Sequence, residues 1–210
     1  MAATHKSAPR LIGGHVALDL VNTVAWRPDP DRRRDDLGDF EALAAWCSRA
    51  GLIDEVTTRE LAAAAAVHPR AAARAFHVAC ALREYLHDAL APILEGNPVL
   101  PPPQMHDLLV DAIGHSHLIG MPMYWQLTPH GVADIPRLLA LHALNLLQSP
   151  ELPLLRLCDG PDCGWIFLDH TRSHSRRWCS SSDCGNNDRA RRYYVRQRNA
   201  AGGFRKAPVA

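Results

Sequence analysis

Four cysteines constrain the fold of this 210-residue chain more than any other feature. They form two pairs, Cys158-x4-Cys163 and Cys179-x4-Cys184, with fifteen residues between the pairs. Two close pairs on either side of a short hairpin can bring four thiolates to one point. Tetrahedral Zn²⁺ requires this arrangement, with Zn–S bonds of about 2.3 Å. The spacing is close to the two-pair zinc pattern, with four intervening residues in place of two, so it predicts one structural zinc ion held by these four cysteines.

Disulfides and simple buried thiols are the alternatives for the same cysteines. Disulfides need an oxidising compartment. Residues 1–24 lack the continuous apolar stretch of a signal peptide, because Asp19 and Asn22 interrupt it. No run of about eighteen apolar residues occurs, so no membrane span is predicted. We therefore expect a cytoplasmic protein with reduced cysteines, in which Cys47 and Cys80 belong to apolar helical patterns and to the core.

Charge is distributed unevenly along the chain, although the overall net charge is only +1. From Arg156 to the C-terminus there are eleven Lys and Arg residues against five Asp residues, a net charge of +6 that leaves −5 for the preceding part. Such asymmetry is typical of an acidic body with a tail that binds a polyanion. A solvated basic tail without a partner is the alternative.

Periodicity and capping residues predict an α+β fold with a mostly helical body, a few N-terminal and central strands, and a small C-terminal zinc module. Pro150 and Pro153 mark the boundary between a body over residues 1–152 and a module over 153–206. Predicted helices cover about 40–49, 58–68, 69–94, 104–114, 134–148 and 183–198, with caps at Asp39, Thr57 or Thr58, Asp134 and Ser182 or Asp183. Predicted strands cover 15–24, a hairpin of 116–119 with 123–127, and a segment within 163–169.

Arginines around the cysteines are the candidates for nucleic-acid contacts. On a helical period Arg189, Arg192 and Arg196 fall on one stripe of the last predicted helix. Arg176 and Arg177 lie beside Cys179 and are candidates to reach phosphates or base edges. We expect two tryptophans of the module, Trp165 and Trp178, to pack over the zinc, with base stacking as the alternative.

Three polar residues near the N-terminus are candidates to line a pocket in the body: His15, Asp19 and Asn22. The alternative is structural, with Asp19 and Asn22 bonding to the backbone at a strand end, and we favour it. A small-molecule effector and a second copy of the chain are the candidate partners of the body. The sequence contains no Gly-rich phosphate loop, nucleophile elbow or H-E-x-x-H motif, and no enzyme activity is predicted.

Short runs at the two ends of the chain resemble a known pair of domains. The C-terminal part is similar to the CGNR-type zinc-finger family in Cys158-x4-Cys163-Gly164-Trp165-Ile166-Phe167-Leu168-Asp169, Ser175-Arg176-Arg177-Trp178-Cys179 and Cys184-Gly185-Asn186. The N-terminal part resembles the opening of the ABATE-type domain in Gly13-Gly14-His15 and Leu18-Asp19-Leu20-Val21-Asn22-Thr23. The sequence departs from the name-giving CGNR motif at Asn187, where the family has arginine.

The resemblance implies a bacterial, stress-induced transcription regulator whose zinc finger binds DNA. The body would then sense a signal or form a homodimer. A zinc-stabilised module for protein interaction or dimerisation, whose arginines face an acidic partner instead of DNA, is the alternative. An enzyme that uses the histidines of the body is the third and least favoured class.

Overall fold

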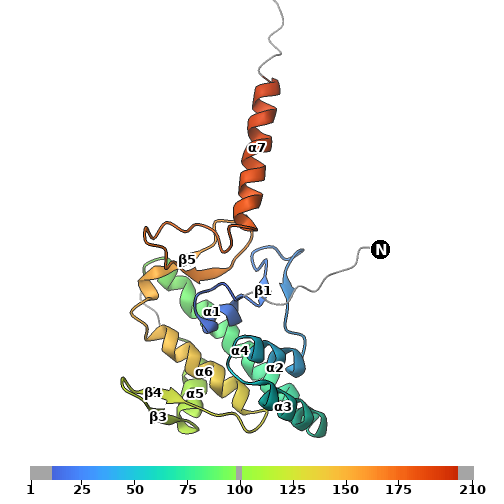
Figure 1. Ribbon diagram of the computed structural model, residues 1–210, viewed down its shortest axis with the longest axis vertical. Helices are drawn as coiled ribbons and strands as arrows, with labels where there is room; N and C mark the ends of the chain where they lie inside the picture. The colour runs from blue at the N-terminus through green and yellow to red at the C-terminus, as the bar shows by residue number, and fades with distance from the viewer. Residues whose placement is uncertain (1–10, 98–100, 203–210) are drawn as a thin grey trace, which may run out of the picture.

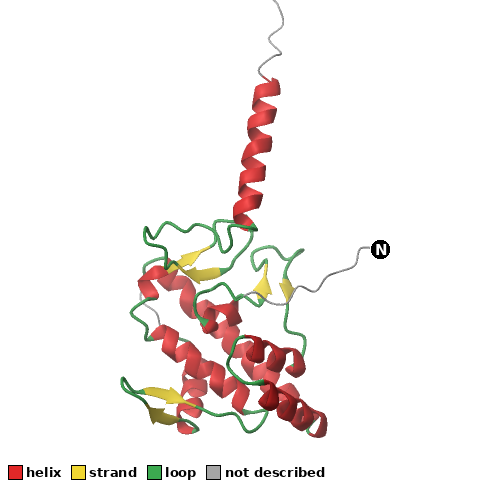
Figure 2. Ribbon diagram, in the orientation of Figure 1, coloured by secondary structure: helices red, strands yellow, loops and turns green. Residues whose placement is uncertain are grey.

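The computed structural model describes residues 11–97 and 101–202, with side chains described up to residue 198. Arg205 and Lys206, which the predicted charge of the tail includes, lie outside the described residues. Helices dominate, and the strands are short (Figures 1 and 2). In chain order the elements are α1 (Val16–Val21), β1 (Val24–Ala25), β2 (Arg34–Asp35), α2 (Phe40–Arg49), α3 (Glu55–Val67), α4 (Pro69–Leu94), α5 (Pro103–Gly114), β3 (His117–Ile119), β4 (Tyr124–Gln126), α6 (Asp134–Leu147), a 3-10 turn (Leu152–Leu154), β5 (Leu155–Leu157), β6 (Ile166–Leu168) and α7 (Cys184–Gly202).

Helix α4 is the longest element, and the body packs around it (Figure 1). Its residues Leu82, Leu86 and Leu90 recur every four positions, so they lie on one face of the helix, and all three are fully buried. Helix α6 packs against both α4 and α5, while α2, α3 and the short α1 also contact α4. The predicted α+β fold with a mostly helical body is therefore confirmed. Among the described helices, none combines the length and the apolar character that a membrane span requires.

The strand predicted over residues 15–24 is wrong. This segment forms helix α1, and only Val24 and Ala25 belong to a strand. His15 caps the N-terminus of this helix, because its Nδ1 accepts the N–H of Ala17 at 3.1 Å. Every residue from Ala17 to Val21 is buried, so the core surrounds this helix on nearly all sides. Apolar periodicity cannot separate a strand from a helix that is buried all round.

Most predicted helices are confirmed, and two predicted caps are wrong. Asp39 caps α2, and its carboxylate accepts the N–H of Ala42 at 2.8 Å. Helix α3 begins earlier than predicted, because Asp54 rather than a threonine accepts the N–H of Thr57 at 2.7 Å. Asp134 is the first residue of α6 and accepts backbone N–H groups that precede the helix, so it is not the cap.

The strands form three separate two-stranded antiparallel sheets. Strand β1 pairs with β2 through Val24 opposite Asp35, and β3 pairs with β4 in the predicted central hairpin. Strand β5 pairs with β6 through three residue pairs: Leu155 with Leu168, Arg156 with Phe167, and Leu157 with Ile166. The β5–β6 hairpin matters most for the site, because its connecting loop carries the first cysteine pair.

One buried arginine fixes the β1–β2 hairpin to the body. Arg83 of α4 is buried and donates from both terminal nitrogens to the Asp35 carboxylate, at 2.8 and 2.6 Å, and to Thr23 Oγ1 at 3.0 Å. Burial by itself would lower the pKa of Arg83. The hydrogen bond to Asp35 and the nearby charges both raise the pKa, and together they outweigh burial, so the pKa is raised overall. A buried charge that is paired in this way holds one geometry, because breaking the pair would leave it uncompensated.

The C-terminal hairpin packs directly on the helical body. Leu155, Ile166 and Leu168 are buried in the same apolar cluster as the leucines of α4. The amide of Asn22, next to the end of α1, donates to Ile166 O at 2.8 Å and accepts from Ile166 N at 2.9 Å. Asn22 thus makes the two bonds that a neighbouring strand would make. The division into residues 1–152 and 153–206 as separate domains stays a prediction.

We expect Asn22→Ala to lower the free energy of unfolding by about 1–3 kcal/mol, because it leaves a buried N–H and a buried C=O of Ile166 without partners. The measurement is urea unfolding with zinc in excess. Asn187→Ala is the matched control, since Asn187 is exposed and surface substitutions usually stay within about 0.5 kcal/mol. Equal stability of the two variants would contradict the role of Asn22.

Candidate metal centre

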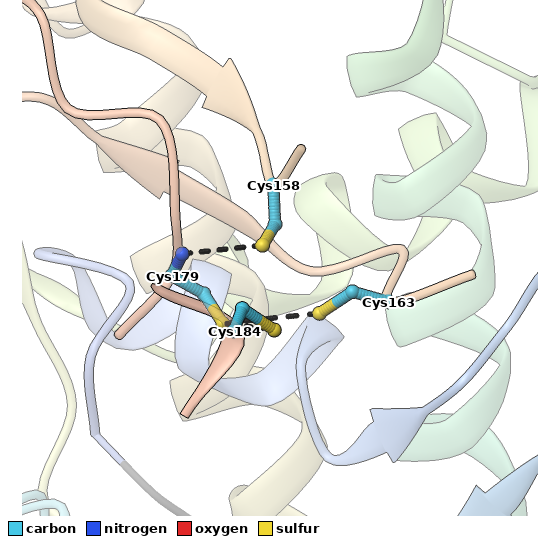
Figure 3. A group of neighbouring side chains, drawn as sticks. All are labelled: Cys158, Cys163, Cys179 and Cys184. Carbon is cyan, nitrogen blue, oxygen red and sulfur yellow. Dashed lines mark hydrogen bonds between the residues drawn. The ribbon is translucent and has the colours of Figure 1, made fainter. Parts of the chain in front are cut away.

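Four segments bring the cysteines together (Figure 3). Cys158 follows β5, and Cys163 lies in the loop that leads to β6. Cys179 belongs to the loop before α7, and Cys184 is the first residue of that helix. All four side chains are buried. The first pair therefore depends on the β5–β6 hairpin, and the second pair determines where α7 starts.

The sulfur geometry fits a tetrahedral metal. The four Sγ atoms lie within 4.8 Å of one another. The distances are 3.8 Å from Cys163 to Cys179 and 3.6 Å from Cys179 to Cys184. A tetrahedron with Zn–S bonds of about 2.3 Å has edges of about 3.8 Å, whereas a disulfide needs about 2.05 Å. The cluster thus has the dimensions of a four-thiolate zinc site and not of two disulfides.

Backbone groups of the module orient the sulfur of Cys158. Its Sγ accepts the N–H of Gly160 at 3.3 Å and the N–H of Cys179 at 3.2 Å, the second of which Figure 3 marks. Gly160 has to be glycine, because a Cβ at this position would lie 2.8 Å from the Sγ of Cys184. Such N–H···S bonds stabilise a thiolate, and partners of this kind tune metal ligands.

The electrostatics of the cluster favour a bound cation. Hydrogen bonding with the Cys163 and Cys179 side chains lowers the pKa of Cys158 to about 2. The same contact with Cys158 raises the pKa of Cys163 to about 12 and also raises that of Cys179, while burial raises that of Cys184. One thiolate therefore forms readily and opposes ionisation of the other three. A divalent ion offsets this repulsion, and its binding releases the remaining protons.

An apolar shell surrounds the cysteines. Phe167 is fully buried in the cluster, and Ile12, Trp165 and Trp178 pack against it, so the expected packing of both tryptophans is confirmed. The guanidinium of Arg176 lies over the Phe167 ring at 4.1 Å. Four cysteine ligands leave no open position on the metal, which favours a structural rather than a catalytic zinc.

Arg176, a predicted nucleic-acid contact, donates mainly to the module itself. Its Nε bonds to Trp178 O at 3.1 Å, and its Nη2 bonds to Ile12 O at 3.2 Å and Cys179 O at 2.5 Å. The side chain thereby joins the N-terminal segment to the second cysteine pair. These contacts favour a structural role, and the nucleic-acid contact predicted for Arg176 stays untested.

The other four predicted arginines are exposed. Arg177 pairs with Asp159 at 2.7 Å, and its guanidinium lies 5.1 Å from the centre of the Trp178 ring. Arg189 donates to Ser181 O at 3.0 Å, and Arg192 pairs with the buried Asp188 at 2.7 Å. Arg196 lies further along α7, beside Arg192. Their function as nucleic-acid contacts stays a prediction.

The residues predicted to line a pocket bond to the backbone and to α6. Asp19 accepts the N–H groups of Ile12 and Gly13, both at 2.7 Å, and Asn22 holds Ile166 as described above. Burial is the largest effect on the Asp19 carboxyl and raises its pKa, although both N–H groups act in the opposite direction. His15 Nε2 lies 3.0 Å from Asn145 Oδ1 of α6. The structural alternative accounts for these contacts, and an effector pocket stays a prediction.

One important residue escaped the sequence analysis. Asp169 is fully buried and accepts the N–H and the hydroxyl of Thr171, at 3.0 and 2.6 Å, and the N–H of Arg176 at 2.8 Å. It therefore shapes the loop between β6 and the second cysteine pair. Its place at the end of a predicted strand, within the run that resembles the zinc-finger family, is the signal that could have revealed it.

Fold and site together define a zinc-finger protein, with a helical body and one structural zinc ion held by four cysteines. Comparison with protein-family models agrees with this class. The CGNR zinc finger matches residues 155–197, and the ABATE model, described as "Putative stress-induced transcription regulator", matches residues 14–150. The chain belongs to the ABATE family and carries a CGNR zinc finger. No curated protein matches the chain.

Purified protein should contain one zinc ion per chain. Cys158→Ser should lose it, because three thiolates without Cys158 no longer complete the tetrahedron, and acidification should release it, because protons compete for the sulfurs. Metal analysis and a chromogenic zinc-release titration measure both effects. Cys47→Ser is the matched control, since Cys47 lies in the body core. Full zinc content in a Cys158→Ser, Cys184→Ser double variant would exclude these ligands.

Proposed function

We propose that the protein is a cytoplasmic DNA-binding transcription regulator, rather than an enzyme, and that helix α7 is its DNA-contacting element. The observation that carries the proposal is the position of this helix. It begins at Cys184 in the zinc site and projects away from the rest of the molecule (Figure 1). Its described side chains from Arg189 to Arg198 are all exposed. A helix that buries no face of its own in the fold is suited to a partner outside it.

The charge of α7 supports a polyanion as that partner. Between Cys184 and Arg198 the sequence has one acid, Asp188, and five arginines, which gives a net charge of +4. Asp188 is buried and pairs with Arg191 and Arg192 at 3.1 and 2.7 Å, so its charge faces its own helix. The arginines lie on more than one side of the helix, and a polyanion such as DNA can neutralise them together.

The zinc site fixes the direction of α7. Cys184 connects the first turn to the metal, and the N–H of Gly185 bonds to Ser180 O at 3.0 Å. The Asn186 amide donates to Ser182 O at 2.7 Å and accepts from Arg189. A helix whose first turn is held by metal and side-chain bonds presents its arginines in a defined orientation. This preorganisation lowers the entropy cost of binding.

The alternative is a zinc-stabilised interaction or dimerisation module that binds an acidic protein. It draws on the same exposed arginines, and salt dependence distinguishes it from DNA binding, because phosphate contacts release condensed counterions. Two further partners remain part of the proposal: a second copy of the chain, which would dimerise through the body, and a small-molecule effector. The family description supports a role in a stress response.

Arg192→Ala and Arg196→Ala should each weaken binding to all DNA sequences alike and reduce the slope of log K against log salt by about one unit. Fluorescence anisotropy with genomic fragments at several salt concentrations measures the slope. Arg70→Ala and Arg74→Ala are the matched controls, because they remove the same charge from exposed positions on α4. If the combined Arg177, Arg192 and Arg196 alanine variant binds DNA with unchanged affinity at low salt, the proposal fails.

Asn187→Arg should tighten DNA binding modestly and steepen the same salt slope by about one unit, because it adds one phosphate contact. Asn187 is exposed and lies one turn before Arg191, so the new arginine would extend a row that already exists. Asn187→Gln is the control for side-chain length without charge. A slope equal to that of the original protein would show that this position faces away from DNA.

A further inference from the structure

We infer that α7 enters the major groove of duplex DNA and reads bases with one face, formed by Ala190, Tyr193 and Gln197, while two arginine rows hold the flanking phosphates. The inference rests on the proposed function and adds the form of the nucleic acid and the residues that select its sequence. It comes from the arrangement of the described side chains around the helix.

Two arginine rows run along α7. With about 100° of rotation per residue, Arg189, Arg192 and Arg196 fall within about 60° of one another, and Arg191 and Arg198 fall within about 20°. The centres of the two rows are separated by roughly 140° around the helix on one side and by about 220° on the other. The rows therefore divide the helix surface into two faces of different chemistry.

The wider face lacks charge and carries groups that can bond to bases. Gln197 lies about midway between the two arginine rows, with Ala190, Tyr193 and Tyr194 about 20°, 40° and 60° away. The Gln197 Nε2 is 3.1 Å from Tyr193 Oη, so the tyrosine orients the amide one turn further along. Ala190 has the smallest side chain on this face and lets the helix backbone approach the base edges.

The narrower face contains the acid. Asp188 lies about 180° from Gln197, so the one carboxylate between Cys184 and Arg198 is on the side opposite the proposed base-reading face. Val195 is exposed on the same side as Asp188. Phosphates approaching the wider face therefore meet arginines on both flanks and no aspartate between them.

This arrangement matches the dimensions of a major groove. The groove of B-form DNA is about 12 Å wide and admits one α-helix, and an amide can bond to adenine N6 and N7 there. Tyr193 and Gln197 are separated by about 6 Å along the helix axis, which corresponds to about two base-pair steps of 3.4 Å. The face should therefore read one or two adjacent base pairs. Arg176, by contrast, donates to backbone carbonyls of the module.

The test selects preferred duplexes from a randomised library with the zinc-loaded full chain and compares variants on them. Gln197→Ala should lose at least about fivefold of its preference at one or two adjacent base pairs, with an unchanged salt slope on random DNA. Tyr193→Phe should lose part of the same preference, because it releases the Gln197 amide. Val195→Ala is the matched control and should keep the full preference. Zinc content and circular dichroism show that each variant is folded.

Different outcomes separate the two levels of the proposal. Duplex binding without any sequence preference, or a preference that Gln197→Ala leaves intact, overturns the base-reading face while DNA binding stands. Tighter binding to single-stranded than to duplex DNA also overturns it, because the proposed face requires a duplex major groove. Such a result would indicate that Tyr193 and Tyr194 stack on unpaired bases instead. The absence of salt-dependent binding to any nucleic acid overturns the proposed function itself.

Discussion

The convergence of four cysteine sulfurs on one zinc ion is the interaction on which the C-terminal module of the structure depends. Two of these sulfurs belong to the β5–β6 hairpin and its loop, and Cys184 is the first residue of α7. The hairpin also buries Leu155, Ile166 and Leu168 in the core of the body. The metal therefore connects a surface helix to the main core through one short hairpin. The small apolar cluster around the cysteines, with Phe167 at its centre, lies between α7 and the main core, so zinc occupancy is expected to affect the presentation of α7 first.

The polar residues in the ABATE-type opening of the chain also connect the helical body to the β5–β6 hairpin. Asp19 holds the backbone of Ile12 and Gly13, and Asn22 holds Ile166 in the manner of a strand neighbour. The N–H of Leu168 also bonds to Gly13 O at 2.8 Å. Unpaired backbone groups at a buried strand edge are costly, and these residues satisfy them. The motif that resembles the family thus has a structural explanation that requires no ligand.

The sequence predicted those features that depend on short-range chemistry. The cysteine spacing predicted the metal cluster, because all four ligands lie between residues 158 and 184. Asp39 predicted the start of α2, because a capping residue bonds within the first turn of its helix. The prediction failed at α1, whose burial on all sides removes the amphipathic pattern. The bond from Arg176 to the carbonyl of Ile12, more than 160 residues away in the chain, likewise depends on tertiary packing that no local pattern predicts. The projection of α7 and the packing of the hairpin on the body depend on contacts distant in sequence, which periodicity does not encode.

The cost of α7 to the free protein is a physical reason to propose a polyanion as its partner. An isolated helix is marginally stable in water, and arginines three or four positions apart, such as Arg189, Arg192 and Arg196, repel one another by a few tenths of a kcal/mol per pair. Asp188 relieves part of this repulsion only near the zinc site, through its pairs with Arg191 and Arg192. Beyond that point the described helix contains no carboxylate, so a row of phosphates would remove a repulsion that the fold itself leaves in place. Under the proposed function, binding of DNA would therefore be coupled to order in the outer turns of α7, with the zinc site as the fixed end from which the helix extends.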